Sequence, residues 1–256
     1  MGNLRYLVFI GIAVLLASSR TEATTMTWTG SELLSDSSVS FPTTAPTVSG
    51  TSIIFGPSTV SDEKLFVVPL FPAGTFTGSE PVAISVALNL TRLACTGSST
   101  AVSCANGDVD FDPHSLLGDG TNLVGAITGD NNGGQFWGTT LVDSGVVGSS
   151  RTLDVVFSGA GFPDIGESFE VFVDFLLEPG QTTVDAAFLS GSGSFVNTSR
   201  ALDATQDMSF IFMRDNEEGE RYQINSLTIT TPVPEPTTIL LLGLGLAGLG
   251  FTRRLH

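Results

Sequence analysis

Apolar and polar residues alternate with a period of two in two long segments of the chain. In residues 82–91, Val, Ile and Leu at the even positions alternate with Ala, Ser, Asn and Thr at the odd positions. In residues 169–177, Phe, Val and Leu occupy the odd positions in the same way. Successive side chains of a strand point to opposite faces, so both segments are predicted strands with one buried face.

Six shorter segments are also predicted strands, because they are rich in β-branched and aromatic residues and are separated by turn formers. They are residues 51–55, 65–70, 152–157, 184–189, 208–213 and 224–229. We find no convincing amphipathic helix between the strands. Eight or more short strands without βαβ alternation predict an all-β fold, a two-sheet antiparallel sandwich that is jelly-roll-like.

Composition agrees with strands joined by turns. The chain has 41% hydrophobic residues, 18 Phe, 29 Gly and 12 Pro, which is too apolar for a disordered chain and too rich in turn formers for a helical bundle. Residues 29–50 are rich in Ser, Thr, Gly and Pro. We interpret them as a long connection or an irregular opening strand.

The first 23 residues have the features of a secretory signal peptide with its signal helix. Arg5 supplies a positive charge, residues 6–17 are apolar apart from Gly11, and Thr21-Glu22-Ala23 places small residues for cleavage after Ala23. The alternative is a permanent membrane anchor. It would need about 20 apolar residues, and the run is shorter.

The C-terminal segment, residues 232–256, combines three parts in a fixed order. Pro234-Glu235-Pro236 predicts an extended, accessible backbone. Residues 239–251 are apolar, with glycines, and form a predicted transmembrane helix. Arg253 and Arg254 follow the helix and would remain cytoplasmic, which places the Pro-Glu-Pro segment on the opposite side of the membrane.

This order of parts closely resembles the PEP-CTERM sorting signal: Pro234-Glu235-Pro236, a glycine-rich apolar helix, and the Arg253-Arg254 pair. The resemblance implies an exosortase partner, an integral-membrane cysteine protease-transpeptidase of Gram-negative bacteria that make exopolysaccharide. It covers about two dozen residues and implies a route of export, not a chemistry for the domain. The alternative is a plain C-terminal anchor on a proline stalk, in which the glycines serve helix packing.

Three parts are therefore expected: a signal peptide over 1–23, a secreted β-sandwich domain over 24–231, and the sorting signal over 232–256. Residues 24–232 hold 24 acidic and 6 basic side chains, a net charge of −18. This charge repels nucleic acid and anionic lipid head groups and favours a well-solvated surface. The protein is expected to be anchored transiently in the inner membrane and then to reach the cell surface or the medium.

Cys95 and Cys104 are the only cysteines, and export would deliver them to an oxidising compartment. We expect a disulfide between them, worth roughly 2 to 3 kcal/mol on the loop-entropy model. A free reactive pair and metal ligation are the alternatives, which the absence of a nearby His disfavours.

Asp108, Asp110 and Asp112 alternate along the chain, and Asp119 follows them. Their oxygens would converge on Ca²⁺ if the segment forms a loop. An EF-hand-type loop starting at Asp108 requires Gly at its sixth position, but Pro113 is found there. We favour a strand in which the three aspartates share one solvated face, so no metal site is assigned to them.

Catalytic motifs are scarce. A Ser-His-Asp triad would have to use His114, because His256 belongs to the tail, and no Gly-x-Ser-x-Gly sequence is present. A glycosidase needs only two facing carboxylates, which sequence alone cannot identify. We therefore expect no catalytic residues and no cofactor, with Ca²⁺ as the one alternative.

Large rings offer a second possible chemistry, because aromatic faces stack on sugars. Trp28, Trp137 and Tyr222 are the candidates, and core or rim packing is the more usual role of such residues. Trp137 is the best exception, since it follows a glycine-rich polar segment.

The sequence thus favours an exported, non-catalytic surface or extracellular-matrix protein that an exosortase processes and that is associated with exopolysaccharide. A calcium-assisted carbohydrate-binding module and a secreted glycosidase are the two alternatives.

Overall fold

The computed structural model describes residues 23–42, 45–56, 63–93, 113–130, 137–144, 155–159, 166–188, 196–197, 201–214 and 221–233. Residues Thr25–Thr231 form one compact unit. Within the described residues no helix is long and apolar enough to span a membrane, and the helices predicted near both termini lie outside those residues.

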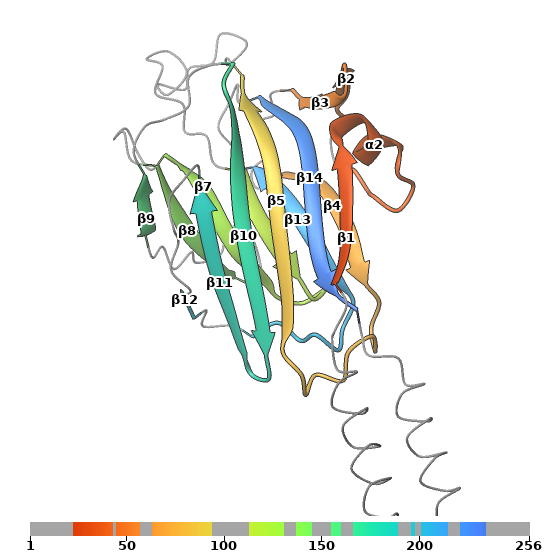
Figure 1. The fold of residues 1–256 in the computed structure, drawn as a ribbon, viewed down its shortest axis with the longest axis vertical. Helices are drawn as coiled ribbons and strands as arrows, with labels where there is room; N and C mark the ends of the chain where they lie inside the picture. The colour runs from red at the N-terminus through yellow and green to blue at the C-terminus, as the bar shows by residue number, and fades with distance from the viewer. Residues whose placement is uncertain are drawn as a thin grey trace, which may run out of the picture. The chain divides into compact units, whose positions relative to one another are not determined.

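Within the part of the chain that the structure describes, the first sheet has eight strands. They are β1 (Ala23–Thr29), β2 (Thr47–Ser49), β3 (Ser52–Phe55), β5 (Val82–Arg92), β10 (Ser168–Glu178), β11 (Gln181–Phe188), β12 (Val196–Asn197) and β14 (Tyr222–Pro232). Their order is β12-β11-β10-β5-β14-β3-β2, and β1 also pairs with β14. Figure 1 shows β11, β10, β5 and β14 side by side in one layer.

Among the described residues, the second sheet has six strands in the order β4-β13-β6-β7-β8-β9. They are β4 (Glu63–Phe71), β6 (Pro113–Gly118), β7 (Leu123–Asp130), β8 (Trp137–Ser144), β9 (Val155–Gly159) and β13 (Met208–Arg214). In Figure 1 this sheet lies behind the first. The predicted all-β, two-sheet antiparallel sandwich is confirmed, and each of the eight predicted strand segments overlaps an observed strand.

The space between the sheets is filled by the apolar faces that the alternation predicted. Every even-numbered residue from Val82 to Leu90 in β5 is at most 2% exposed, and so is every odd-numbered residue from Phe169 to Leu177 in β10. These two strands pair directly, with Val86 opposite Val173. Both predicted buried faces are therefore confirmed.

Aromatic rings connect the two sheets at one end of the core. Phe66 of β4 stacks on Phe212 of β13 with ring centroids 5.2 Å apart, and on Phe55 of β3 at 6.4 Å. Tyr222 of β14 meets the edge of Phe212 at 6.2 Å and is fully buried. Tyr222, a candidate for sugar stacking, thus serves the core, which is its more usual role.

A buried ion pair lies between the ends of two strands of the second sheet. Arg214 ends β13 and is paired in register with Glu63, the first residue of β4. The Arg214 guanidinium donates from Nε to Oε2 of Glu63 over 2.8 Å, and from Nη1 to the carbonyl of Gly56. Both charged side chains are at most 1% exposed, so the pair joins the two strands with little contact with water.

The expectation for residues 29–50 was wrong in part, because they contain a short helix, α2 (Gly30–Ser35). Thr29 caps the helix, and Glu32 completes the capping box by accepting from the Thr29 N–H over 2.8 Å. Leu33 inserts fully into the core. A Cβ on Gly30 would lie 2.4 Å from the Ile224 carbonyl oxygen, so only glycine fits there.

A bulge interrupts the alternation in β14. The register of β14 against β5 shifts between Ile224 and Ser226, which leaves Asn225 without a partner in the ladder. The Asn225 amide instead donates to Asn89 Oδ1 over 2.7 Å and to Thr91 Oγ1 over 2.8 Å. Apolar residues consequently change from even positions before the bulge to odd positions after it.

Glu63→Gln is expected to lower the free energy of unfolding by about 3 kcal/mol, because it removes the buried carboxylate that Arg214 binds. Urea unfolding of the exported protein would measure the change. Glu80→Gln is the matched control: Glu80 is exposed, so the same substitution should change stability by less than about 0.5 kcal/mol. Equal losses in the two variants would contradict a structural role for the ion pair.

Candidate functional site

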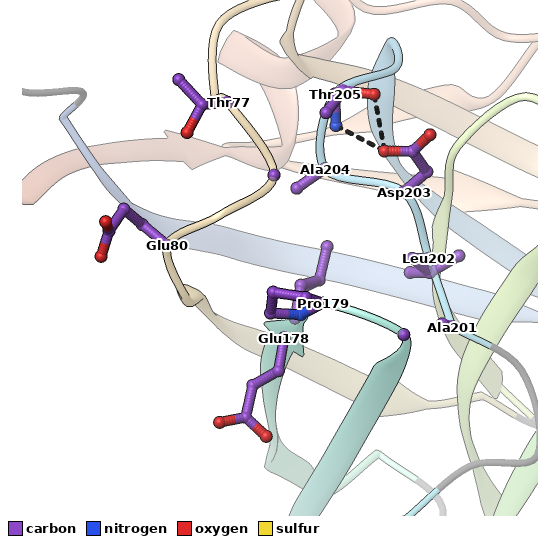
Figure 2. A pocket seen from close by; sticks show the side chains of 12 residues that line it. Thr77, Glu80, Glu178, Pro179, Ala201, Leu202, Asp203, Ala204 and Thr205 are labelled. Atoms are coloured by element: carbon purple, nitrogen blue, oxygen red, sulfur yellow. Dashed lines mark hydrogen bonds between the residues drawn. The ribbon is translucent and has the colours of Figure 1, made fainter.

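A cavity of about 450 Å³ lies at one end of the sandwich, where three connections meet. They are residues 77–80 before β5, residues 178–180 between β10 and β11, and residues 201–205 before β13. Figure 2 shows these three segments around the cavity. The site therefore combines parts of the chain that are far apart in the sequence.

The cavity has apolar walls and a polar rim. Leu177, Leu202 and Ala204 are between 2% and 7% exposed and form the inner wall, while the exposed Pro179 ring covers a further side. Hydroxyl and carboxylate groups surround this apolar surface. These polar residues are Thr77, Glu80, Glu178, Asp203 and Thr205.

The turn from β10 to β11 has a fixed shape. Pro179 holds its own φ, and Gly180 has a φ of +77° that glycine adopts without strain. Glu178 and Gln181 close the turn as a register pair. The turn thus presents the Pro179 ring and the Glu178 carboxylate from a rigid hairpin end.

The wall at 201–207 is held by neighbouring elements. The Leu202 N–H donates to Thr182 Oγ1 of β11 over 2.8 Å. The Gly74 N–H donates to the Thr205 carbonyl over 2.8 Å, and Asp207 accepts from the Ala73 N–H over 2.7 Å. Hydrogen bonds from β11 and from the connection between β4 and β5 therefore fix the backbone of this wall.

Asp119 links the same wall to the turn between β6 and β7. Its Oδ1 accepts from the N–H groups of Asn122 (2.6 Å) and Thr121 (2.9 Å), and its Oδ2 accepts from the N–H of Asp203 (3.0 Å) and the amide of Asn122 (3.2 Å). Burial alone would raise the pKa of Asp119, but these hydrogen bonds outweigh it and hold the pKa below 3.8. Both oxygens accept hydrogen bonds here, so Asp119 anchors the 201–205 wall to the turn between β6 and β7.

The carboxylate of Asp203 faces its own loop. It accepts from the Thr205 hydroxyl over 2.6 Å and from the Thr205 N–H over 2.9 Å, as Figure 2 shows. These two bonds lower the pKa of Asp203, the side-chain bond most. All three carboxylates of the rim are exposed, but the hydrogen bonds of Asp203 tie it to its own loop.

The lining determines what the cavity can hold. Among the described residues that line it there is no Lys, Arg, His or Cys. Carboxylates at the rim repel anions, and apolar walls disfavour a strongly hydrated ion. Within the described part of the chain, no group of three or more His, Cys, Asp or Glu side chains is placed to hold a metal ion.

Most residues singled out from the sequence lie outside the described residues. These are Cys95, Cys104, Asp108, Asp110, Asp112, Pro234, Glu235, Pro236, Arg253 and Arg254. The disulfide, the calcium alternative and the roles of the tail residues therefore stay predictions. Ala23, the proposed cleavage position, is the exposed first residue of β1.

The structure places three further residues that the sequence singled out: His114, Trp28 and Trp137. His114 lies in β6 with 1% exposure. Trp28 is partly buried against the core, and its indole N–H donates to Asp36 Oδ2 over 2.9 Å, which places it in rim packing. Trp137 begins β8, opposite Asp130 of β7.

Sequence reasoning missed the cavity itself. The sequence predicted only that turn formers separate the strands, and Glu178-Pro179-Gly180 is one such turn. The Asp203 to Gln206 segment carries the one local signal, an Asp followed two residues later by Thr, which is typical of a side chain that caps its own turn.

Residues 232–254 match the family model of the PEP-CTERM protein-sorting motif. The chain carries a PEP-CTERM motif. The resemblance seen in the tail is thus confirmed, with bounds two residues shorter than the predicted segment. The PEP-CTERM motif indicates a secreted protein and implies an exosortase as its processing partner.

Solved structures share the fold at low sequence identity. A conserved carbohydrate esterase from Shiga toxin-encoding bacteriophage phi24B is similar with a TM-score of 0.51 at 9% identity, over 82% of this chain and 100% of that chain. Peanut lectin with a 9mer peptide reaches 0.49 at 13% identity, over 82% and 97%. Basic winged bean lectin with Tn-antigen reaches 0.49 at 9%, over 83% and 100%. No curated protein matches the chain by sequence.

Asp119→Asn is expected to lower the free energy of unfolding at pH 7 by about 2 kcal/mol, because the ionised carboxylate accepts four hydrogen bonds. The pKa of Asp119 is lower in the folded state, so its contribution is present above pH 3.8 and is lost as the pH falls through the folded-state pKa. The gap between variant and wild type should narrow in that acidic range.

Urea midpoints measured from pH 7 down to pH 3 would test both statements. Asp174→Asn, at an exposed position of β10, is the control and should change stability by less than about 0.5 kcal/mol. A gap between Asp119→Asn and wild type that stays constant with pH would contradict the assigned role.

Proposed function

We propose that this protein is a non-catalytic surface or extracellular-matrix protein of a Gram-negative bacterium, sorted through its C-terminal tail and associated with exopolysaccharide. An exosortase at the inner membrane recognises Pro234-Glu235-Pro236 and removes the apolar segment that Arg253 and Arg254 retain at the cytoplasmic side. The processed protein then stays on the cell surface or enters the medium.

The observation that carries this proposal is the place of the motif directly after the folded domain. β14 ends at Pro232, and the PEP-CTERM motif begins at the same residue. Its prolines lack N–H donors and favour an extended backbone. A processing enzyme would therefore meet an accessible segment without having to unfold the last strand.

The properties of the domain support a passive role in a hydrated matrix. The net charge of −18 over residues 24–232 favours solubility and repulsion between copies. The cavity lining offers hydrogen-bond acceptors and apolar walls without a His or Cys to act as base or nucleophile among its described residues. Such a lining favours binding over acyl transfer.

The calcium-assisted carbohydrate-binding module is the second candidate. It depends on Asp108, Asp110 and Asp112 together with Trp137. A polysaccharide titration with equal affinity in calcium and in a chelator would exclude it. A secreted glycosidase would instead show turnover on polysaccharide that is lost on substitution of one carboxylate.

Replacing Pro234, Glu235 and Pro236 by alanine is expected to leave the tail uncleaved and the protein in the inner membrane. Intact mass and cell fractionation in the native host would measure both effects. The wild type should lose residues 1–23 and its C-terminal apolar segment, and the variant should lose only residues 1–23.

A second variant separates sorting from membrane topology. Arg253→Lys with Arg254→Lys keeps the positive charge that orients the helix, so this variant should still be processed. If wild type and the alanine variant both keep their tails in the envelope, the segment is a plain anchor and the proposal is wrong.

A further inference from the structure

We propose that the cavity between residues 77–80, 178–180 and 201–205 binds one unit of a sugar chain, a hexopyranose ring that carries no carboxylate or sulfate group. This inference rests on the proposed association with exopolysaccharide and names the place of contact. It has its own test, because binding is measured on the isolated protein and does not depend on how the tail is processed.

The size of the cavity fits a single ring. Ligand pockets commonly enclose between about 300 and 1,000 Å³. The volume of about 450 Å³ lies near the lower limit of that range, which suits one small ring and not a stretch of several. Glu80 and Glu178 line the cavity and are exposed, so neighbouring units of a chain that leave the cavity past them would extend into water.

The two kinds of surface on a pyranose match the two kinds of surface in the cavity. Its C–H faces are apolar and would lie against Pro179, Leu202 and Ala204. Its hydroxyl groups donate hydrogen bonds, which the exposed carboxylates of Glu80 and Glu178 accept. Hydrogen bonds to an ionised acceptor are the stronger kind.

Charge restricts the class of sugar. The acidic groups Glu80, Glu178 and Asp203 surround the cavity, and no cation is among its described lining residues. A uronic acid or a sulfated sugar would bring a second negative charge next to these carboxylates. The electrostatic repulsion between these like charges would disfavour binding, and it increases as the bound sugar displaces water from the cavity.

The cavity is largely preformed, which limits the entropy lost on binding. The Asp119, Thr182 and Gly74 hydrogen bonds fix the 201–205 wall. Gly78 approaches Thr205 so closely that a Cβ at Gly78 would lie 2.8 Å from Thr205 Cγ2. Two of the three walls are thus in contact before any ligand arrives.

The competing place for a sugar is the outer face of the first sheet. Phe172 is 39% exposed there, between Ala87 of β5 and Ala187 of β11 in register. Single exposed apolar side chains are common on protein surfaces, whereas the cavity offers walls on three sides. Phe172 therefore provides the comparison variant.

The test uses the exported protein isolated from its host. Calorimetric titration with neutral gluco-, manno- and galacto-oligosaccharides, and with an oligogalacturonate and an oligoglucosamine for comparison, measures affinity. Hydrogen exchange with mass spectrometry locates the site. At least one neutral sugar should bind, with added protection in the peptides that hold residues 77–80, 178–180 and 201–205, and the oligogalacturonate should bind more weakly.

Matched variants make the test specific. Thr77 and Ser79 are both exposed and share one hydroxyl–hydroxyl contact of 2.7 Å, but only Thr77 lines the cavity. Thr77→Trp should therefore weaken binding at least about tenfold, and Ser79→Trp should leave it within about twofold. Glu178→Gln should weaken binding as well, in contrast to Glu170→Gln, an exposed position of the same strand.

Three results would overturn the proposal: no binding of any neutral sugar up to its solubility limit, equal effects of Thr77→Trp and Ser79→Trp, or loss of binding in Phe172→Ala with the cavity variants unaffected. Binding of the oligogalacturonate as tight as that of the neutral sugars would also overturn it, because the carboxylates at the rim should repel an anion. Correct tail processing together with any of these results leaves the sorting function intact and removes only the cavity assignment.

Discussion

Exclusion of water between the two sheets is the constraint on which the rest of the molecule depends. β5 and β10 each turn an unbroken series of apolar side chains inward, and the rings of Phe55, Phe66 and Phe212 fill one end of the same space. Each fully buried large side chain contributes about 1.5 to 3 kcal/mol. The connections around the cavity begin and end at strands of these two sheets. Packing of the sheets therefore fixes the positions of the connections relative to one another.

The sheets were predictable from sequence as far as alternation is visible. β5 and β10 show it without interruption. β7 does not show it clearly. The backbone of β6 lies so close to Gly125 that a Cβ there would be 2.1 Å from the Ser115 carbonyl oxygen. Glycine is therefore required at this position, and the sequence of β7 lacks a side chain where alternation would be read. The helix α2 was missed because six residues are too few to show a helical period, and its signal is the Thr29 and Glu32 capping box.

The sorting motif and the cavity differ in how sequence reveals them. Pro234, Glu235, Pro236 and the two arginines act as a linear segment, so their order in the chain is the information that an enzyme reads. The cavity exists only after folding, because Glu80, Glu178 and Asp203 come from three distant connections. Nothing in the residues around Asp119 indicates that its carboxylate will bind the backbone of Asp203, 84 positions away.

The pairing of the first strand with the last has a consequence for the order of folding during export. Thr25 and Thr27 of β1 contact Thr230 and Thr228 of β14 through their hydroxyls, across 205 and 201 positions of sequence. A chain that crosses a membrane from its N-terminus presents β1 first, and β1 must then wait for β14, which emerges last. The domain is completed only when residue 232 has crossed, at the moment the sorting segment follows. Pairing of β14 with β1 and exposure of the sorting segment would therefore follow one another directly during export. A chain that stops before residue 232 has crossed would have neither a complete sandwich nor an exposed sorting segment.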